Sequence, residues 1–327
     1  MTSVETPDRA RVLMPFTPAE LDGLPSGWPA LVWDGTGRPP AGPRVESVEF
    51  FVIPYTFTGA ALPLLAALPG LRVVQSLSAG VDDVLPHLPD GVTLCNARHV
   101  HSTSAAEHAA ALTLASLRGI PDFVRAQDAQ RWTSGFWPAL ADRTVLLVGY
   151  GSIGAAVEAR LAPFECSILR VARTARQTSR GPVHTLQELP SLLPRADVVV
   201  LTVPLTDATR GLVDARFLAR MKDGALLVNI GRGPVVDTGA LVAEVRSGRL
   251  CAALDVTDPE PLPPGHPLWT APNTLISPHM AAHTSAFLPR ALALVRAQLA
   301  RYAAGEPLAN VVTPPRDDRS GRAAPDG

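Results

Sequence analysis

The chain contains little cysteine, few aromatic residues and a single lysine. Its three cysteines, Cys95, Cys166 and Cys251, lie far apart and form neither a CxxC pair nor a His/Cys cluster at zinc-ligand spacing. We therefore expect free thiols in a reducing cytoplasm, and no metal site. Lys222 is the one lysine among 29 basic residues. Together with the abundant alanine and proline, this skew towards arginine is typical of GC-rich coding and does not indicate a function.

The chain also lacks an excess of either charge and lacks a long uninterrupted hydrophobic run. With 29 basic and 30 acidic residues, the formal net charge of −1 gives no basic footprint for nucleic acid or an anionic membrane. The N-terminal stretch MTSVETPDRA does not have the basic-then-apolar layout of a signal peptide. Phe50–Leu71 carries no charge over 22 residues, but Pro54, Pro63 and Pro69 interrupt it. We expect a strand and a short helix there, and no membrane span.

Apolar material is abundant and arranged in short runs. Hydrophobic residues make up 46% of the 327 residues, enough for two cores at roughly 100–200 residues per domain. The runs alternate with helical stretches, which predicts an α/β fold with parallel sheets and crossover helices. The expected strands are Phe50–Ile53, Leu71–Val74, Val145–Val148, Ile168–Val171, Val198–Val203, Leu226–Ile230, Ala252–Val256 and Thr274–Ile276.

Two further segments have a distinctive composition. Ala105–Leu117 is rich in alanine and leucine and predicts a helix that packs closely, either inside the molecule or against a partner subunit. Thr313–Gly327 is polar and rich in proline and glycine, which predicts a disordered tail.

A glycine-rich phrase follows one of the expected strands directly. In TVLLVGYGSIGAAVEARLAPF (Thr144–Phe164), an aliphatic run leads into Gly149, Gly151 and Gly154 and then into a helix. The first glycine permits a tight turn, the second lets a pyrophosphate approach the backbone, and the third lets the helix pack on the strand. This arrangement predicts a dinucleotide site that also includes Tyr150, Ser152 and Ile153.

The next expected strand bears on which dinucleotide is bound. NAD sites usually place an acidic residue roughly 20 residues past the glycines to bind the ribose 2′-hydroxyl. Here the stretch reads ILRVARTAR, with Ala172 at the expected place, followed by Arg173, Thr174 and Arg176. A guanidinium can bind the 2′-phosphate that a carboxylate would repel. The sequence therefore favours NADP(H), with NAD(H) as the alternative.

Several phrases together resemble a known enzyme family. NIGRGPVVD (Asn229–Asp237), ALDVTDPEPLP (Ala253–Pro263) and SPHMAAHT (Ser277–Thr284) follow SAGVDD (Ser78–Asp83) and AAEHAAALTLASLRGI (Ala105–Ile120). In this order they resemble the D-isomer-specific 2-hydroxyacid dehydrogenase family over about Val45–Val312. The ARTAR stretch is most similar to the NADPH-using glyoxylate/hydroxypyruvate reductase branch.

The resemblance implies a catalytic set of Arg232, Glu260 and His279. Reduction of a 2-keto acid needs a fixed cation for the carboxylate and a proton donor at the carbonyl oxygen. Arginine binds carboxylates in a two-point geometry, and histidine titrates near neutral pH. A neighbouring glutamate would orient the imidazole and raise its pKa.

Further roles follow from the resemblance alone. The Ser78–Gly80 loop would bind the substrate carboxylate through backbone N–H groups, and Asp255 would contact the nicotinamide carboxamide. Asn229 and Asp237 are expected to brace the loop that carries Arg232. The segment expected beneath the cofactor comprises Thr202, Val203 and Pro204, with Ile230 on the neighbouring strand. One departure is Arg98-His99, where the family more often has smaller residues, frequently glycine at the second position.

The sequence thus predicts two Rossmann-like domains with parallel sheets, the cofactor domain inserted into the substrate domain. Residues 1–101 and 287–327 would form the substrate domain, and residues 102–286 the cofactor domain. The expected function is NADPH-dependent reduction of a small 2-keto acid to a D-2-hydroxy acid by a cytoplasmic homodimer. Two alternatives are an NAD-dependent dehydrogenase of the formate or phosphite type and a non-catalytic regulator that senses dinucleotides.

Overall fold

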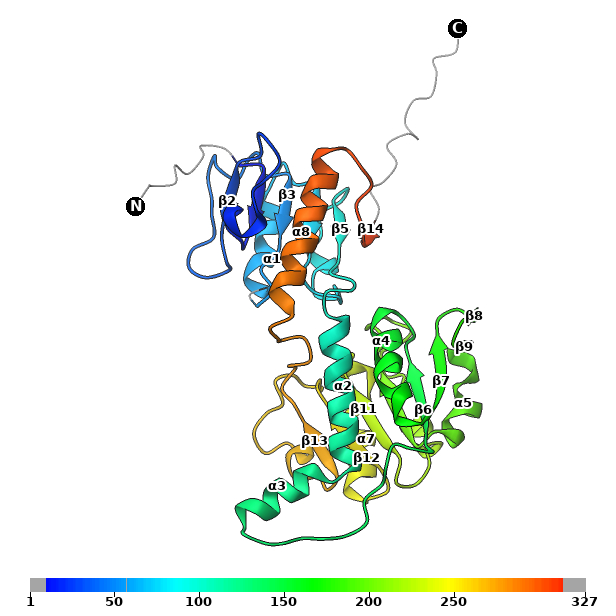
Figure 1. The fold of residues 1–327 in the computed structure, drawn as a ribbon. Coiled ribbons are helices and arrows are strands. Elements are labelled where there is room, and N and C mark those ends of the chain that lie inside the picture. The colour runs from blue at the N-terminus through cyan, green and yellow to red at the C-terminus, as the bar shows by residue number, and fades with distance from the viewer. Residues whose placement is uncertain (1–9, 57, 314–327) are drawn as a thin grey trace. The chain divides into compact units, whose positions relative to one another are not determined.

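The computed structural model describes residues 10–56 and 58–313, which form two compact units (Figure 1). Unit 1 combines the chain up to Val100 with the segment from Ala286 onward, and unit 2 comprises His101–Ser285. Unit 2 is therefore inserted into unit 1. Each unit is built on its own mostly parallel sheet, so the predicted α/β fold class is confirmed.

Unit 1 contains a six-stranded sheet in the order β14-β5-β4-β3-β1-β2. The first five strands along the chain are mutually parallel, and β14 pairs antiparallel with β5 at one edge. The strands are β1 Val12–Met14, β2 Ala30–Val32, β3 Phe50–Val52, β4 Val73–Gln75, β5 Thr93–Cys95 and β14 Val311–Thr313.

Helices cover both faces of this sheet. Because successive residues of a strand point to opposite faces, neighbouring residues pack against different helices. On β3, Phe51 packs in the same apolar cluster as Leu65 of α1 (Thr58–Ala67). Its neighbour Phe50 packs in the cluster that contains Val295 of α8 (Phe287–Ala303). The return of the chain from unit 2 therefore completes the core of unit 1.

Unit 2 contains an eight-stranded sheet in the order β13-β12-β11-β10-β6-β7-β9-β8. Its neighbouring strands are parallel except for the β8–β9 hairpin. The strands are β6 Thr144–Val148, β7 Ser167–Ala172, β8 Arg176–Thr178, β9 Gly181–Thr185, β10 Val198–Leu201, β11 Leu226–Asn229, β12 Cys251–Leu254 and β13 Thr274–Ile276.

Two apolar layers enclose this second sheet. On one face, α2 (Ser102–Leu117) packs against α4 (Ser152–Leu161) and against β11 and β12. The other face is covered by α5 (Leu189–Leu192), α6 (Ala215–Ala219) and α7 (Thr238–Arg246). α6 and α7 begin at aspartate N-caps, Asp214 and Asp237, whose carboxylates accept from backbone N–H groups of the first turn.

The other helical segments are short. α3 spans Ile120–Asp128 and is followed by an extended stretch that leads to β6 (Figure 1). The 3₁₀ turns are Pro18–Leu21, Leu85–His87, Ala162–Phe164, Leu186–Glu188, Leu193–Arg195, Gly233–Val235 and Pro267–Thr270.

Each strand expected from the sequence is present, shifted by a few residues at its ends in several cases. The expected helix at Ala105–Leu117 begins slightly earlier, at Ser102. Phe50–Leu71 holds strand β3 and helix α1, and no helix within the described ranges is long and apolar enough to cross a membrane. The prediction of a disordered tail is wrong for Thr313, which ends β14 and accepts a hydrogen bond from the N–H of Leu94. The rest of that predicted tail, residues 314–327, lies outside the described residues.

Candidate active site

The glycine-rich loop joins β6 to α4 at the carboxyl edge of the unit 2 sheet. Gly149 has φ +106°, and a Cβ there would lie 2.7 Å from the backbone of Thr202. A Cβ on Gly154 would overlap the carbonyl oxygen of Gly149, whereas one on Gly151 would meet nothing within 4 Å. Packing thus requires the first and third glycines, and the second faces open space before the N-terminus of α4. That cradle fits the pyrophosphate of a dinucleotide.

The segment after β7 has the residues that the sequence suggested for the adenosine end of the cofactor. Ala172 is the last residue of β7, and Arg173 and Thr174 follow it with exposed side chains. Arg176 begins β8, and its Nη2 donates to the backbone oxygen of Tyr150, 2.6 Å away. Both arginine side chains are exposed, and Arg176 in addition makes a hydrogen bond to the glycine-rich loop, a difference that could not be predicted from the sequence.

Thr202, Val203 and Pro204 follow β10, next to β6 in the sheet. The hydroxyl of Thr202 donates to the carbonyl oxygen of Gly149 at 2.5 Å, so Thr202 holds the glycine-rich loop. Val203 is part of the apolar core, Pro204 is exposed, and Ile230 is buried. The expected contacts of these residues with a cofactor stay predictions.

Three adjacent parallel strands carry the predicted catalytic residues. Arg232 follows β11, Glu260 follows β12 and His279 follows β13. Because the carboxyl ends of parallel strands meet at one sheet edge, the topology places all three loops at the edge that also carries the glycine-rich loop. Residues distant in the sequence are thereby brought to one end of unit 2.

His279 and Glu260 form a hydrogen-bonded pair. Nδ1 of His279 lies 2.5 Å from Oε1 of Glu260, and about two-fifths of each side chain is exposed (43% and 39%). The hydrogen bond that His279 donates to Glu260 raises the pKa of His279, despite opposing effects of burial and of the Arg232 charge. Burial would raise the pKa of Glu260, but the hydrogen bond and charge of His279 lower it below its ordinary value. The pair therefore favours imidazolium with carboxylate and leaves Nε2 as the proton-donating nitrogen.

The loop that carries Arg232 is tightly packed. A Cβ on Gly233 would overlap the carbonyl of Thr257, and one on Gly231 would lie 2.9 Å from the Val203 oxygen. Asn229 accepts from the N–H of Gly231 and donates to the carbonyl of Arg232, both at 3.0 Å. Asn229 thus braces the loop, as the sequence predicted. Asp237 caps the following helix α7.

Asp255 anchors the loop that carries His279. Its carboxylate is 2% exposed and accepts from the hydroxyl of Ser277 at 2.7 Å and from the N–H groups of Met280 and Ala281 at 2.8 and 3.1 Å. His108 on α2 lies 3.2 Å from the same carboxylate. Although burial raises the pKa of Asp255, these hydrogen bonds hold it below its ordinary value. The predicted contact of Asp255 with a nicotinamide stays a prediction.

His108 is a site-supporting residue that the sequence reasoning missed. Its Nε2 lies 2.8 Å from the hydroxyl of Ser277, so it meets both Ser277 and Asp255. The available signal was the Glu107-His108 pair in the AAEH phrase, because these are the two titratable residues of helix α2.

The predicted substrate-binding loop lies in unit 1, directly after β4. The N–H of Ser78 donates to the hydroxyl of Ser76, and the amide of Asn96 donates to the carbonyl of Ala79 at 2.9 Å. These bonds hold the loop from both sides, and the role predicted for Ser78, Ala79 and Gly80 stays a prediction. His99 has φ +74°, the left-handed region that favours glycine, which explains why a glycine suits this position.

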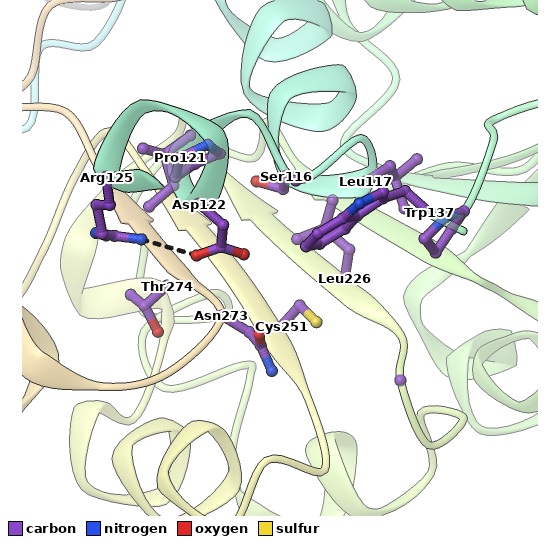
Figure 2. A pocket seen from close by; sticks show the side chains of 14 residues that line it. Ser116, Leu117, Pro121, Asp122, Arg125, Trp137, Leu226, Cys251, Asn273 and Thr274 are labelled. Atoms are coloured by element: carbon purple, nitrogen blue, oxygen red, sulfur yellow. Dashed lines mark hydrogen bonds and ion pairs between the residues drawn. The ribbon is translucent and has the colours of Figure 1, made fainter. Parts of the chain in front are cut away.

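A separate cavity of about 150 Å³ lies at the opposite edge of the unit 2 sheet, where β11, β12 and β13 begin. Figure 2 shows Trp137 beside it and the Asp122–Arg125 ion pair, whose atoms are 3.1 Å apart. Its lining contains none of the predicted site residues. Within residues 10–56 and 58–313, no group of three or more His, Cys, Asp or Glu could hold a metal ion.

Comparison with known proteins gives one consistent family. Residues 110–281 match the model of the family described as D-isomer specific 2-hydroxyacid dehydrogenase, NAD binding domain. A glyoxylate reductase of Aeropyrum pernix is 32% identical over 310 residues, which cover 90% of this chain and 92% of that relative.

Solved structures agree with this assignment. A D-isomer specific 2-hydroxyacid dehydrogenase of Xanthobacter autotrophicus Py2, in complex with NADPH and MES, shares 31% identity with a TM-score of 0.76, covering 93% of this chain and 98% of that one. An NADPH-dependent glyoxylate/hydroxypyruvate reductase of Sinorhizobium meliloti, in complex with NADP and sulfate, shares 28% identity with a TM-score of 0.77 over the same shares of the chains. The chain therefore belongs to the D-isomer-specific 2-hydroxyacid dehydrogenase family, oxidoreductases that act on a CH–OH group.

Proposed function

We propose that the protein reduces a small 2-keto acid to the D-2-hydroxy acid, with NADPH preferred over NADH. The observation that carries the reaction is the hydrogen bond between His279 and Glu260 on neighbouring strand ends, next to the loop of Arg232. Glu260 raises the pKa of the His279 imidazole, so that the ring is more readily protonated at neutral pH and can act as a general acid.

Each charged residue then has a distinct task. Arg232 binds the substrate carboxylate and polarises the carbonyl, because a guanidinium donates two parallel hydrogen bonds. His279 donates the proton on Nε2 to the carbonyl oxygen, and Glu260 keeps the ring oriented and charged until that transfer. A bound dinucleotide supplies the hydride for the carbonyl carbon. In the oxidation direction, the same imidazole, now neutral, accepts the proton from the hydroxyl.

The preference for NADPH is supported by the end of β7. No carboxylate follows Ala172, and the exposed Arg173 is the next residue. A hydrogen bond to a charged group contributes about 1.5–3 kcal/mol, which corresponds to roughly 10- to 150-fold in favour of a 2′-phosphate. The NADPH and NADP complexes of the two solved relatives agree with this direction.

The substrate class is proposed from the relatives. The relatives from Aeropyrum and Sinorhizobium are named as glyoxylate or glyoxylate/hydroxypyruvate reductases. We therefore expect glyoxylate and hydroxypyruvate to be reduced faster than bulkier keto acids such as phenylpyruvate.

A spectrophotometric screen tests the proposal. NADPH oxidation is followed by its loss of absorbance with glyoxylate, hydroxypyruvate, pyruvate and phenylpyruvate, and the screen is repeated with NADH. Turnover of a keto acid that is lost in His279→Ala supports the proposal. Oxidation of formate or phosphite with NAD, or dinucleotide binding without turnover of any of these compounds, would instead support one of the two alternative functions.

We also propose a homodimer. The stretch between α3 and β6 is extended, and its Trp132 and Phe136 side chains are fully exposed. Ile120 and Val124 on α3 are exposed as well. Such a row of large apolar side chains fits a subunit interface. Sedimentation velocity should give a dimer for the wild type and a monomer for the double variant Trp132→Ser, Phe136→Ser; a monomeric wild type at micromolar concentration refutes the dimer.

A further inference from the structure

Beneath the glycine-rich loop, unit 2 contains a buried polar cluster of Tyr150, Glu158 and Arg170. Glu158 on α4 is 3% exposed and Arg170 on β7 is 8% exposed. The Tyr150 hydroxyl and the Arg170 Nη2 both donate short hydrogen bonds to the Glu158 carboxylate, and Arg170 Nε donates to Oε2 at 2.8 Å. Arg170 Nη1 also donates to the carbonyl of Ile168. Two parallel hydrogen bonds and a tyrosine hydroxyl thus satisfy the buried carboxylate.

The charges of the cluster are matched. Although burial raises it, the pKa of Glu158 is held below its ordinary value by the hydrogen bonds from Arg170 and Tyr150. A further guanidinium, that of the half-exposed Arg180, lies 3.8 Å from Glu158. A buried carboxylate with these partners stays ionised and fixes the groups that donate to it. The hydroxyl end of the Tyr150 ring is therefore fixed by its hydrogen bond to Glu158.

Arg176 connects this cluster to the segment after β7. Its Nη2 donates to the carbonyl of Tyr150 at 2.6 Å, its Nη1 approaches the carbonyl of Thr174 at 3.5 Å, and its guanidinium lies 5.7 Å from the centroid of the Tyr150 ring. Arg170 lies 5.8 Å from the same centroid. One side chain from β8 thus joins the glycine-rich loop to the segment that follows β7.

We propose that Arg176 is a positioning residue that holds these two cofactor-binding segments together through Tyr150, and that recognition of the 2′-phosphate falls to Arg173. This inference rests on the dinucleotide site of the proposed function. It divides two arginines that the sequence left equivalent. Both side chains are exposed, but the Arg176 guanidinium donates to the backbone carbonyls of Tyr150 and Thr174, which leaves the 2′-phosphate to Arg173.

The two roles predict different patterns of cofactor affinity. The glycine-rich loop would hold the pyrophosphate, which NADPH and NADH share. Loss of a residue that positions this loop weakens both cofactors by the same factor. Loss of a residue that binds the 2′-phosphate weakens NADPH alone, and that effect fades as salt screens the charges.

Isothermal titration calorimetry separates these patterns without turnover. Dissociation constants for NADPH and NADH are measured for the wild type, Arg176→Gln and, as the matched control, Arg173→Gln, at low and high salt. We expect Arg176→Gln to raise both constants by roughly 2- to 12-fold, the range for one lost hydrogen bond of ordinary strength, with their ratio unchanged within about twofold. Arg173→Gln should raise the constant for NADPH alone, most strongly at low salt.

A second variant tests the path through Tyr150. Tyr150→Phe keeps the ring but removes the hydroxyl from Glu158, so it should weaken both cofactors by a smaller, equal factor. In the double variant with Arg176→Gln, the effects should combine less than multiplicatively, because both act on the same loop. Thermal unfolding of each variant without cofactor identifies any that is simply misfolded; Arg176→Lys, which keeps one donor, then replaces Arg176→Gln.

The outcomes separate this inference from the proposed cofactor preference. If the wild type binds NADPH and NADH equally, the preference is wrong, yet an equal loss of both in Arg176→Gln still supports the positioning role. If Arg176→Gln weakens NADPH alone, or weakens neither cofactor, the positioning role is wrong. If the wild type binds neither dinucleotide, both ideas are wrong.

Discussion

Replacing Glu260 by glutamine should shift the pH dependence of catalysis. Glutamine keeps an oxygen that can accept from Nδ1 of His279, so the ring keeps its orientation, but the charge that favours imidazolium is lost. Keto-acid reduction needs the protonated ring. Its kcat/KM should be constant at low pH and fall as pH rises through the pKa of His279, which Glu260 raises. The substitution therefore moves this fall to lower pH.

The size of the shift follows from the hydrogen bond. A bond to a charged group contributes about 1.5–3 kcal/mol and a neutral one about 0.5–1.5 kcal/mol, a difference of about 1–1.5 kcal/mol. At 1.36 kcal/mol per pKa unit, this corresponds to about one unit. Because about two-fifths of each side chain is exposed (43% and 39%), solvent screens part of the interaction. We expect a decrease of about 0.5–1 unit.

The assay is kcat/KM for the keto acid at saturating NADPH across pH 5 to 10, about the range in which histidine and its neighbours titrate. Above both breaks, the variant should be roughly 3- to 10-fold slower than the wild type, as the same pKa shift implies, and at low pH the two should converge. Glu188→Gln is the matched control, because Glu188 lies 2.8 Å from His184 on the surface, away from the catalytic loops. A break at the same pH in wild type and Glu260→Gln would refute the coupling of Glu260 to His279.

Three other changes have expected outcomes. Arg232→Ala should lower kcat/KM by a factor corresponding to about 2–5 kcal/mol, because the substrate carboxylate loses its charged partner. The dissociation constant for NADPH should not change. Retention of half the wild-type kcat/KM would remove Arg232 from the mechanism. Ala172→Asp combined with Arg173→Ile should reverse the cofactor preference in kcat/KM, since it adds an acceptor for the 2′-hydroxyl and removes a cation; an unchanged NADPH:NADH ratio would contradict this reading. Asp255→Asn should lower the free energy of unfolding by about 1.5–3 kcal/mol, because an amide cannot accept from all of the donors around the buried carboxylate; denaturant unfolding with an unchanged midpoint would contradict its anchoring role.

The catalytic trio was identified in the sequence through the family resemblance, and its location could be predicted because each residue follows an apolar run. Arg232, Glu260 and His279 come after β11, β12 and β13, and the carboxyl ends of parallel strands share one edge of the sheet. The local pattern therefore carried the spatial information. The same reasoning predicted the glycine-rich loop, whose glycines are required by contacts within a few residues or with the next strand.

The buried polar groups could not be predicted in this way. His108 meets Asp255 and Ser277 because α2 packs against β12 and β13, and the adjacent Glu107 marks the position as polar without indicating these partners. Glu158 and Arg170 look like surface charges in the sequence, and the packing of α4 on the sheet buries both. Such pairs depend on tertiary contact and leave no periodic pattern.

The strands missed from the sequence fail for a related reason. The missed strands among the described residues are β1, β2, β5, β8, β9 and β14. All but β9 have three residues, too few for a period-two pattern to stand out. β14 pairs with β5 at the edge of the sheet, although Leu94 and Thr313 are 219 residues apart in the sequence. The polar residues around Thr313 suggested a tail, although a polar residue suits an edge strand whose outer side is solvated.

The insertion of unit 2 into unit 1 has a consequence for the order in which the protein is made. When Val100 has been synthesised, the first sheet still lacks α8 and β14, so the apolar face that includes Phe50 is uncovered. At about 5–20 residues per second, a ribosome needs roughly 10–40 s to complete the inserted residues before α8 appears. Unit 2, which is continuous in sequence, can fold within that interval, whereas the segment synthesised first reaches its native core last. The apolar face of unit 1 that includes Phe50 therefore stays uncovered during translation until α8 has been synthesised.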